Sequence, residues 1–318
     1  MLMGVASLAE GQTAQLADMV RIAEAQRLAE QIQGKVWPNW EKAPFAVLFV
    51  APDSEWLIGY PRTPSGFAEV GYSVLLRSKI LSRPRQFDPK LLATFPAFGL
   101  PPVVVVGRAD STGKTSTEWV VTVLHEHFHQ LQMSDTNYIS AVDKLGLSGD
   151  DKTGMWMLNY PFPYQTPQIA TAYAATSRRL AELLKGSTAE ARQAFWRSYA
   201  DFLASFTEKD RRYFSFQVWQ EGISRYVELR VAELAATDYQ PSVEFLALPG
   251  VEPFSEVAAR MRAAIMKELL NPDLPKRKRV SFYAFGAGLG LLLDLDGQDW
   301  KQRYLSEKFF VERYAGVE

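Results

Sequence analysis

The pattern of hydrophobic residues changes between residues 107 and 117, and this change constrains the fold most strongly. Before it, short apolar runs separated by Pro, Gly and Asp predict β-strands. After it, longer segments with helical periodicity predominate. A sheet followed by a series of helices is typical of an α+β protein. We therefore predict an α+β fold, with an N-terminal helix and β-rich lobe at residues 1–116 and a helical lobe at residues 117–318, the two forming one compact unit.

The elements expected within these lobes can be placed along the chain. After a loose N-terminus, we expect an amphipathic helix at residues 14–33, ended by Gly34. Strands are expected at residues 45–50, 56–60, 72–76 and 103–106, with a helical insert at residues 89–95. Further helices are expected at residues 118–132, 170–184, 189–206, 213–236, 255–269, 282–294 and 300–313. Irregular chain is expected at residues 146–168 and 241–253.

The composition excludes several classes of function. The formal net charge is −1, so the chain has no overall positive field that would attract nucleic acid or an anionic membrane. It contains no cysteine, which excludes disulfides, thiolate metal sites and a cysteine nucleophile. Apolar runs such as residues 289–295 are too short to span a bilayer, so we predict no membrane span. These features suit a soluble protein and leave the compartment open, export to a periplasm included.

The candidate metal-binding and catalytic residues lie at residues 125–129, where His-Glu-His-Phe-His satisfies the H-E-x-x-H pattern. Because residues i and i+4 share one face of a helix, His125 and His129 can bind one Zn²⁺ ion. Glu126 lies about 100° around the helix from His125, within reach of a water activated by that ion. We therefore predict that His125 and His129 are metal ligands and that Glu126 is the catalytic base.

The neighbouring residues support a helix at this motif. Thr115 and Glu118 match a capping box, which would begin the helix just before the apolar residues of its core face. All three histidines of the chain lie within residues 125–129, which favours a metal site over a chance match. His127 faces away from the other two, and we interpret it as a hydrogen-bonded packing histidine.

The third ligand of a catalytic zinc site must be a carboxylate here, because no fourth histidine exists. Asp135 stands six positions after His129, where metzincins place their third ligand. Those enzymes need a glycine at the position that Gln132 occupies, and a helix that continues through Gln132 would carry Asp135 away from the ion. The competing candidate is Glu221, in the helix expected at residues 213–236.

The segment around Glu221 reads Trp-Gln-Glu-Gly-Ile-Ser-Arg-Tyr-Val-Glu. It resembles the second zinc-binding helix of gluzincins, especially the aminopeptidase-N-like metallopeptidases, which carry Asn-Glu-Gly-Phe-Ala-x-Tyr-x-Glu. The resemblance implies a zincin-like fold with Glu221 as the third zinc ligand and with Gly222 allowing close approach of a helix. Glu228 lies on nearly the same face, either as a carboxylate that bonds a ligand histidine or as a solvated charge.

A further segment, Tyr-Ala-Phe-Gly at residues 283–286, resembles the Tyr-x-x-Gly segment downstream in the same family. The resemblance implies that Tyr283 donates a hydrogen bond to the oxyanion, and the alternative is a packing aromatic. Two features depart from the family. Glu221 follows His129 by 92 positions, a longer spacing. The Gly-x-Met-Glu-Asn segment that grips a free amino terminus is absent from the strand region, so aminopeptidase activity is not implied.

Three other patterns in the sequence are explained without a functional site. Gly107 and Gly113 mimic a P-loop, but five residues separate them where a Walker A motif has four. The glycines at residues 286–290 do not follow a strand, and close helix packing accounts for them. The basic run at residues 276–279 is expected to be a solvated loop.

The sequence thus predicts a zinc metallopeptidase acting on a peptide or protein substrate. A zinc hydrolase of a non-peptide amide or ester is the first alternative, because the same chemistry would serve. The second is a non-catalytic metal-binding protein. The presence of Glu126 argues against it, since a structural site needs ligands but no base.

Overall fold

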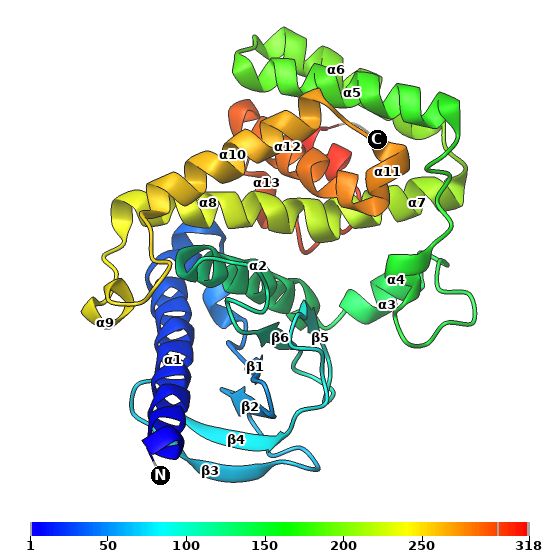
Figure 1. Ribbon diagram of the computed structural model, residues 1–318. Coiled ribbons are helices and arrows are strands. Elements are labelled where there is room, and N and C mark those ends of the chain that lie inside the picture. Colours follow the sequence, from blue (N-terminus) through cyan, green and yellow to red (C-terminus); the bar gives the residue numbers. More distant parts are fainter. Residues whose placement is uncertain (1, 298, 317–318) are drawn as a thin grey trace. The chain divides into compact units, whose positions relative to one another are not determined.

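The protein has an α+β fold in which a six-stranded sheet lies in the N-terminal half and helices dominate the C-terminal half (Figure 1). The computed structural model describes residues 2–297 and 299–316. By packing, the chain divides into a first unit, Met1–Ser134 with Arg230–Ala258, and a second unit, Asp135–Leu229 with Ala259–Glu318. The predicted fold class is confirmed. The division predicted at residue 116 follows secondary-structure content rather than packing and stays a prediction.

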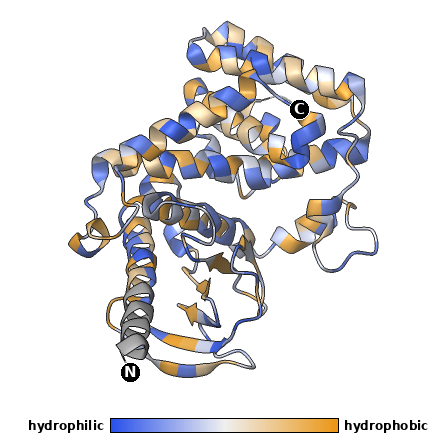
Figure 2. Ribbon diagram, viewed as in Figure 1, coloured by the Kyte–Doolittle hydropathy of each residue, from blue (hydrophilic) through white to orange (hydrophobic). Residues whose placement is uncertain are grey.

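The sheet of the first unit has the strand order β3-β4-β2-β1-β6-β5. Strands β1 and β6 are parallel neighbours inside the sheet, and both are buried along their whole length. Continuous runs of Val, Leu and Phe suit strands covered on both faces, and Figure 2 shows their hydrophobic colouring. The strands are β1 (Val47–Val50), β2 (Ser54–Ile58), β3 (Ala68–Ser73), β4 (Ser78–Pro84), β5 (Leu92–Phe95) and β6 (Val103–Gly107).

Two of the predictions for the sheet were wrong. The helical insert predicted at residues 89–95 is instead strand β5, which pairs antiparallel with β6. This pairing gives the backbone of β5 its hydrogen-bond partners beside a buried strand, and it outweighs the local preference of Leu and Ala for helix. Strand β4 was not predicted, and the strand expected at residues 72–76 lies earlier in the chain, as β3.

Helices α1 (Leu2–Val36) and α2 (Ser116–Ser134) pack on each other, and α2 also packs on β5 and β6. The capping box is confirmed. The Glu118 N–H donates to Thr115 Oγ1 at 3.1 Å, and the Thr115 N–H donates to the Glu118 carboxylate at 3.2 Å. The predictions of a loose N-terminus and of a helix end at Gly34 were wrong. Helix α1 begins at Leu2 and continues to Val36, which is buried in the core.

The first unit also contains two short helices, the 3₁₀-helix η1 (Trp40–Lys42) and α9 (Val243–Leu246). The remaining helices are α3 (Tyr138–Asp143), α4 (Trp156–Asn159), α5 (Pro167–Lys185), α6 (Ala189–Ala204), α7 (Glu208–Gln217), the π-helix η2 (Val218–Gly222), α8 (Ile223–Asp238), α10 (Phe254–Leu270), α11 (Leu274–Arg277), the 3₁₀-helix η3 (Lys278–Val280), α12 (Ser281–Asp296), α13 (Trp300–Arg303) and the 3₁₀-helix η4 (Val311–Ala315). The predicted helices at residues 170–184, 189–206, 255–269 and 282–294 are therefore confirmed, with small shifts at their ends.

Two predicted helices are interrupted. The one expected at residues 213–236 is broken by the π-helix η2. The one expected at residues 300–313 was wrong, since only α13 and η4 form there. The irregular chain between them places Tyr304 on Trp219, with stacked rings 4.4 Å apart. Burying these two aromatic rings stabilises the irregular path.

The buried helix α12 organises the second unit through its contacts with α5, α6, α7 and η2. At its crossing with η2 the two backbones meet. A Cβ added at Gly222 would lie 2.6 Å from the Gly286 Cα, so both positions require glycine. The close packing predicted for these glycines is confirmed. Among the described residues, no helix combines the length and hydrophobicity of a membrane span, as predicted.

Candidate metal centre

Helix α2 carries His125 and His129 one turn apart. Their ring centroids are 5.0 Å apart, and the two rings are inclined by 78°. Both residues are buried, with 6% and 5% of their surface exposed. Imidazole nitrogens are costly to bury unless they gain a partner, and a metal ion is one partner that two such rings can share.

The orientation of His129 is fixed by a second side chain on the same helix. Its Nδ1 lies 2.6 Å from Oε1 of the buried Gln132. A ring that donates from Nδ1 to an amide oxygen keeps the lone pair of Nε2 for a metal. Sequence reasoning considered Gln132 only as a residue that continues the helix. Its i, i+3 spacing from a ligand histidine was the signal that could have identified it.

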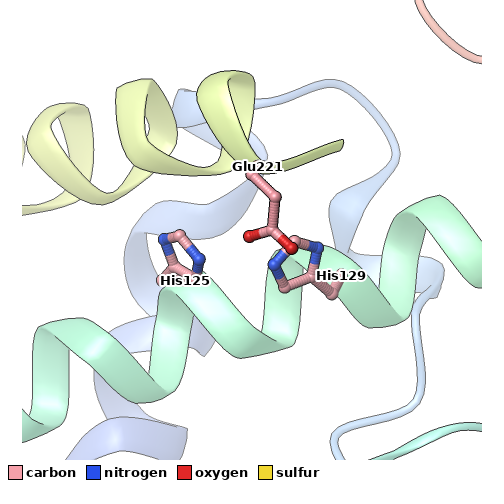
Figure 3. A group of neighbouring side chains, drawn as sticks. All are labelled: His125, His129 and Glu221. Carbon is pink, nitrogen blue, oxygen red and sulfur yellow. The ribbon is translucent and has the colours of Figure 1, made fainter. Parts of the chain in front are cut away.

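Glu221 comes from the π-helix η2, whose turn is wider than that of an α-helix. His125, His129 and Glu221 each offer a ligand atom, and these atoms all lie within 4.8 Å of one another. Figure 3 shows the Glu221 carboxylate directed toward the two imidazole rings. Two imidazoles and one carboxylate are a donor set that suits zinc and leaves a coordination position for water.

The side chain of Glu126 is held by strand β5. Thr94 Oγ1 lies 2.8 Å from the Glu126 carbonyl oxygen and 2.9 Å from Glu126 Oε2, so its hydroxyl is shared between both acceptors in a three-centre hydrogen bond. Both residues are buried. Sequence reasoning missed Thr94 because it expected a helix here, and a threonine in a short apolar segment gives no signal of its own.

Tyr283 lies in the first turn of α12 and forms a hydrogen bond with Glu221. Its hydroxyl also accepts a hydrogen bond from Arg279 Nη1 at 3.0 Å. Burial and, next, the charge of Glu221 raise the pKa of Tyr283 well above its ordinary value, although Arg279 acts in the opposite direction. The hydroxyl therefore stays protonated and able to donate. The oxyanion role of Tyr283 stays a prediction.

Glu228 is 3% exposed, so the interpretation as a solvated charge was wrong. Its Oε2 lies 2.6 Å from Arg225 Nη1, which supplies the opposite charge that a buried carboxylate requires. Its predicted bond to a ligand histidine stays a prediction.

Asp135 takes no part in the group of His125, His129 and Glu221. Helix α2 continues through Gln132 to Ser134, and the Asp135 carboxylate then accepts from Lys308 Nζ at 2.9 Å. The continuation of the helix follows the prediction and leaves Glu221 as the candidate third ligand.

His127 packs in the core of the first unit. Its ring nitrogens are hydrogen-bonded to Gln130 and Gln33, at 2.8 Å and 2.9 Å, and the ring stacks on Trp40. Burial lowers the pKa of His127 to about 4, so the ring is neutral at physiological pH. Its interpretation as a packing histidine is confirmed.

Comparisons with protein-family models, with curated proteins and with solved structures find no match. The function is therefore argued from the residues of this chain.

Proposed function

We propose that this protein is a zinc-dependent metallopeptidase. The observation that carries the proposal is the grouping of His125, His129 and Glu221, with Glu126 on the helix of the two histidines. Glu126 belongs to neither the ligand set nor an ion pair seen in the described residues, which suits a base rather than a structural charge. When bound, zinc supplies a Lewis acid that polarises the scissile carbonyl and lowers the pKa of a water molecule.

The side chains around the site then transfer protons, orient the base and donate a hydrogen bond to the carbonyl oxygen. Glu126 accepts a proton from the attacking water and passes it to the amine that leaves. Thr94 holds the Glu126 carboxylate in one orientation during both transfers. Tyr283 donates to the carbonyl oxygen as negative charge develops there, and it exchanges its hydrogen bond with Glu221 for this one.

A peptide substrate is favoured over an ester by the place of β5 at the end of the sheet. A terminal strand can pair its backbone with an extended peptide, which would then run beside the residues that β5 positions. Because Thr94 of β5 bonds to Glu126, such a peptide would pass close to the proposed base. A small ester has no backbone to use this edge.

The proposal is tested by metal analysis and hydrolysis assays on the parent chain and on Glu126→Gln. We expect about one zinc per chain in both proteins, because the ligands are unchanged. We expect Glu126→Gln to lose hydrolysis of a peptide library by a factor of roughly 100 or more, the usual effect of removing a general base. Glu256→Gln, an exposed glutamate on α10, is the matched control and should keep full activity.

Three results would contradict the proposal. Activity retained by Glu126→Gln would remove it as the base. Zinc retained by Glu221→Ala but lost from Asp135→Ala would identify another third ligand. A zinc-loaded parent chain that cleaves small esters or amides and no peptide would be a different hydrolase, and one that cleaves none of these would be a metal-binding protein.

A further inference from the structure

The basic run at residues 276–279 is not a uniformly solvated loop. Lys276, Arg277 and Lys278 are exposed, whereas Arg279 is half-buried. Directly before Arg279 the backbone of Lys278 adopts φ 50° and ψ −133°.

Arg279 is separated from the candidate metal centre by one side chain. Its Nη1 donates to Tyr283 Oη at 3.0 Å, and Tyr283 in turn bonds to Glu221. Its guanidinium carbon lies 5.9 Å from the centre of the Tyr283 ring, as does that of Arg225. A ligand bound at the metal would therefore have a guanidinium within a few atoms of it.

The charge of Arg279 lacks an ion-pair partner within the part of the chain that the structure describes, where no carboxylate lies within 4.0 Å of it. Its neighbours differ in this respect. Arg225 pairs with Glu228 at 2.6 Å, and Arg277 pairs with Glu268 at 2.9 Å. Apart from its bond to Tyr283, the guanidinium has N–H groups available for a further acceptor.

Arg279 nevertheless stays charged. Burial acts to lower its pKa, but the nearby Tyr283 hydroxyl and Glu221 carboxylate outweigh burial and hold the pKa above its ordinary value. A divalent cation bound to Glu221 would neutralise the negative charge of this carboxylate. The net charge around Arg279 would then be positive. An anionic group on the bound molecule would restore the balance.

We propose that Arg279 binds a carboxylate of the substrate next to the metal centre, so that the site prefers peptides with a carboxylate close to the scissile amide. The planar guanidinium can bind a carboxylate through two parallel hydrogen bonds, which a lysine cannot do. The free C-terminus and an acidic side chain are the two sources of such a group. The proposal rests on the proposed function, which identifies the substrate as a peptide.

The test measures binding by calorimetry in the zinc-loaded Glu126→Gln chain, where the probes are not cleaved. The probes are acetyl-Ala-Phe with a free carboxylate, its C-terminal amide, and acetyl-Glu-Phe-amide, whose only carboxylate is in a side chain. We expect at least one acid probe to bind about tenfold or more tightly than acetyl-Ala-Phe-amide, as a charge-assisted hydrogen bond requires. The identity of that probe shows whether the C-terminus or the side chain supplies the carboxylate.

Adding Arg279→Gln should remove this preference, and Arg279→Lys should keep part of it. Arg277→Gln is the matched control from the same basic run and should leave the preference unchanged. Unchanged zinc content and circular dichroism in Arg279→Gln would show that the loss is not a folding effect. Equal binding of acid and amide probes, or a preference that survives Arg279→Gln, would overturn the proposal.

Failure of the proposed function gives a different result. If the parent chain with Glu126 cleaves acid and amide peptides at equal rates, the peptidase stands and the role of Arg279 is wrong. If it cleaves no peptide while the binding preference depends on Arg279, the carboxylate site stands and the peptidase is wrong.

Discussion

At the residue scale, two polar side chains hold the groups that would perform the chemistry. Gln132 bonds to Nδ1 of His129, and Thr94 bonds to the Glu126 carboxylate. Both are buried, so neither bond competes with bulk water. A metal ligand and a base that are fixed before the substrate arrives need no reorganisation during the reaction.

Replacing Gln132 should weaken zinc binding. Gln132→Leu removes the oxygen that orients His129, and the loss of such a partner typically costs about 10- to 100-fold in metal affinity. Competition with a chromophoric chelator measures the zinc Kd. The control is Gln33→Leu, which removes an equivalent bond from the non-ligand His127. Equal zinc affinity in Gln132→Leu and the parent chain would contradict this role.

Replacing Thr94 should slow the reaction without loss of metal. Thr94→Val keeps the shape of the side chain but lets the Glu126 carboxylate rotate, and misplacement of a catalytic group costs roughly 10- to 100-fold in rate. Thr94→Ser should restore most of the activity, since it returns the hydroxyl. The measurements are kcat on a peptide substrate and zinc per chain. A serine variant as slow as the valine variant would point to packing instead.

At the element scale, the features that sequence patterns predicted are those set by local interactions. The capping box at Thr115, the helix that carries His125 and His129, and its continuation through Gln132 all depend on residues at most a few positions apart. The formation of strand β5 at residues 92–95 depends on pairing with β6, and the break at η2 lies where α12 crosses it. These distant contacts leave no periodicity to detect, and Glu221 was selected by resemblance to a known motif.

The crossing of η2 and α12 predicts opposite effects for the same substitution at two helical glycines. Gly222→Ala would place a Cβ 2.6 Å from the Gly286 backbone, so it should destabilise the fold by about 1–3 kcal/mol or more. Gly34→Ala meets only an ordinary contact at 3.6 Å and should stabilise α1 by about 0.5–1 kcal/mol. Chemical denaturation measures both. Equal effects at the two positions would contradict the close crossing.

At the scale of the whole molecule, a buried acid outside the candidate site should make stability depend on pH. Burial raises the pKa of Glu312 to about 7, and a hydrogen bond from its own backbone N–H and the nearby Arg211 and Arg313 reduce this effect only in part. Its Oε2 has no hydrogen-bond partner among the described residues. Glu312 is 4% exposed, so solvent does little to stabilise its charged form.

Between pH 4.5 and about 7 the folded chain binds more protons at Glu312 than the unfolded chain, whose carboxyl titrates near 4.5. The free energy of unfolding should therefore fall as the pH rises through this window, by an amount on the order of 3 kcal/mol. Urea denaturation at several pH values measures it. Glu312→Gln should flatten the profile, whereas the exposed Glu244→Gln should leave it unchanged. If the free energy of unfolding of Glu312→Gln depends on pH as that of the parent chain does, another group causes the pH dependence.

The π-helix η2 amounts to one surplus residue within an otherwise regular helical path from α7 to α8. Deleting a single codon there would let the two helices join without a break. Because the wider turn absorbs the surplus residue, α7 and α8 would keep nearly the same rotational phase, and the change would fall on the side chains of η2 itself. The direction of Glu221 thus depends on that one residue, whereas Arg225 and Glu228 on α8 do not. Such a deletion would give a more regular helix at the expense of the carboxylate's direction.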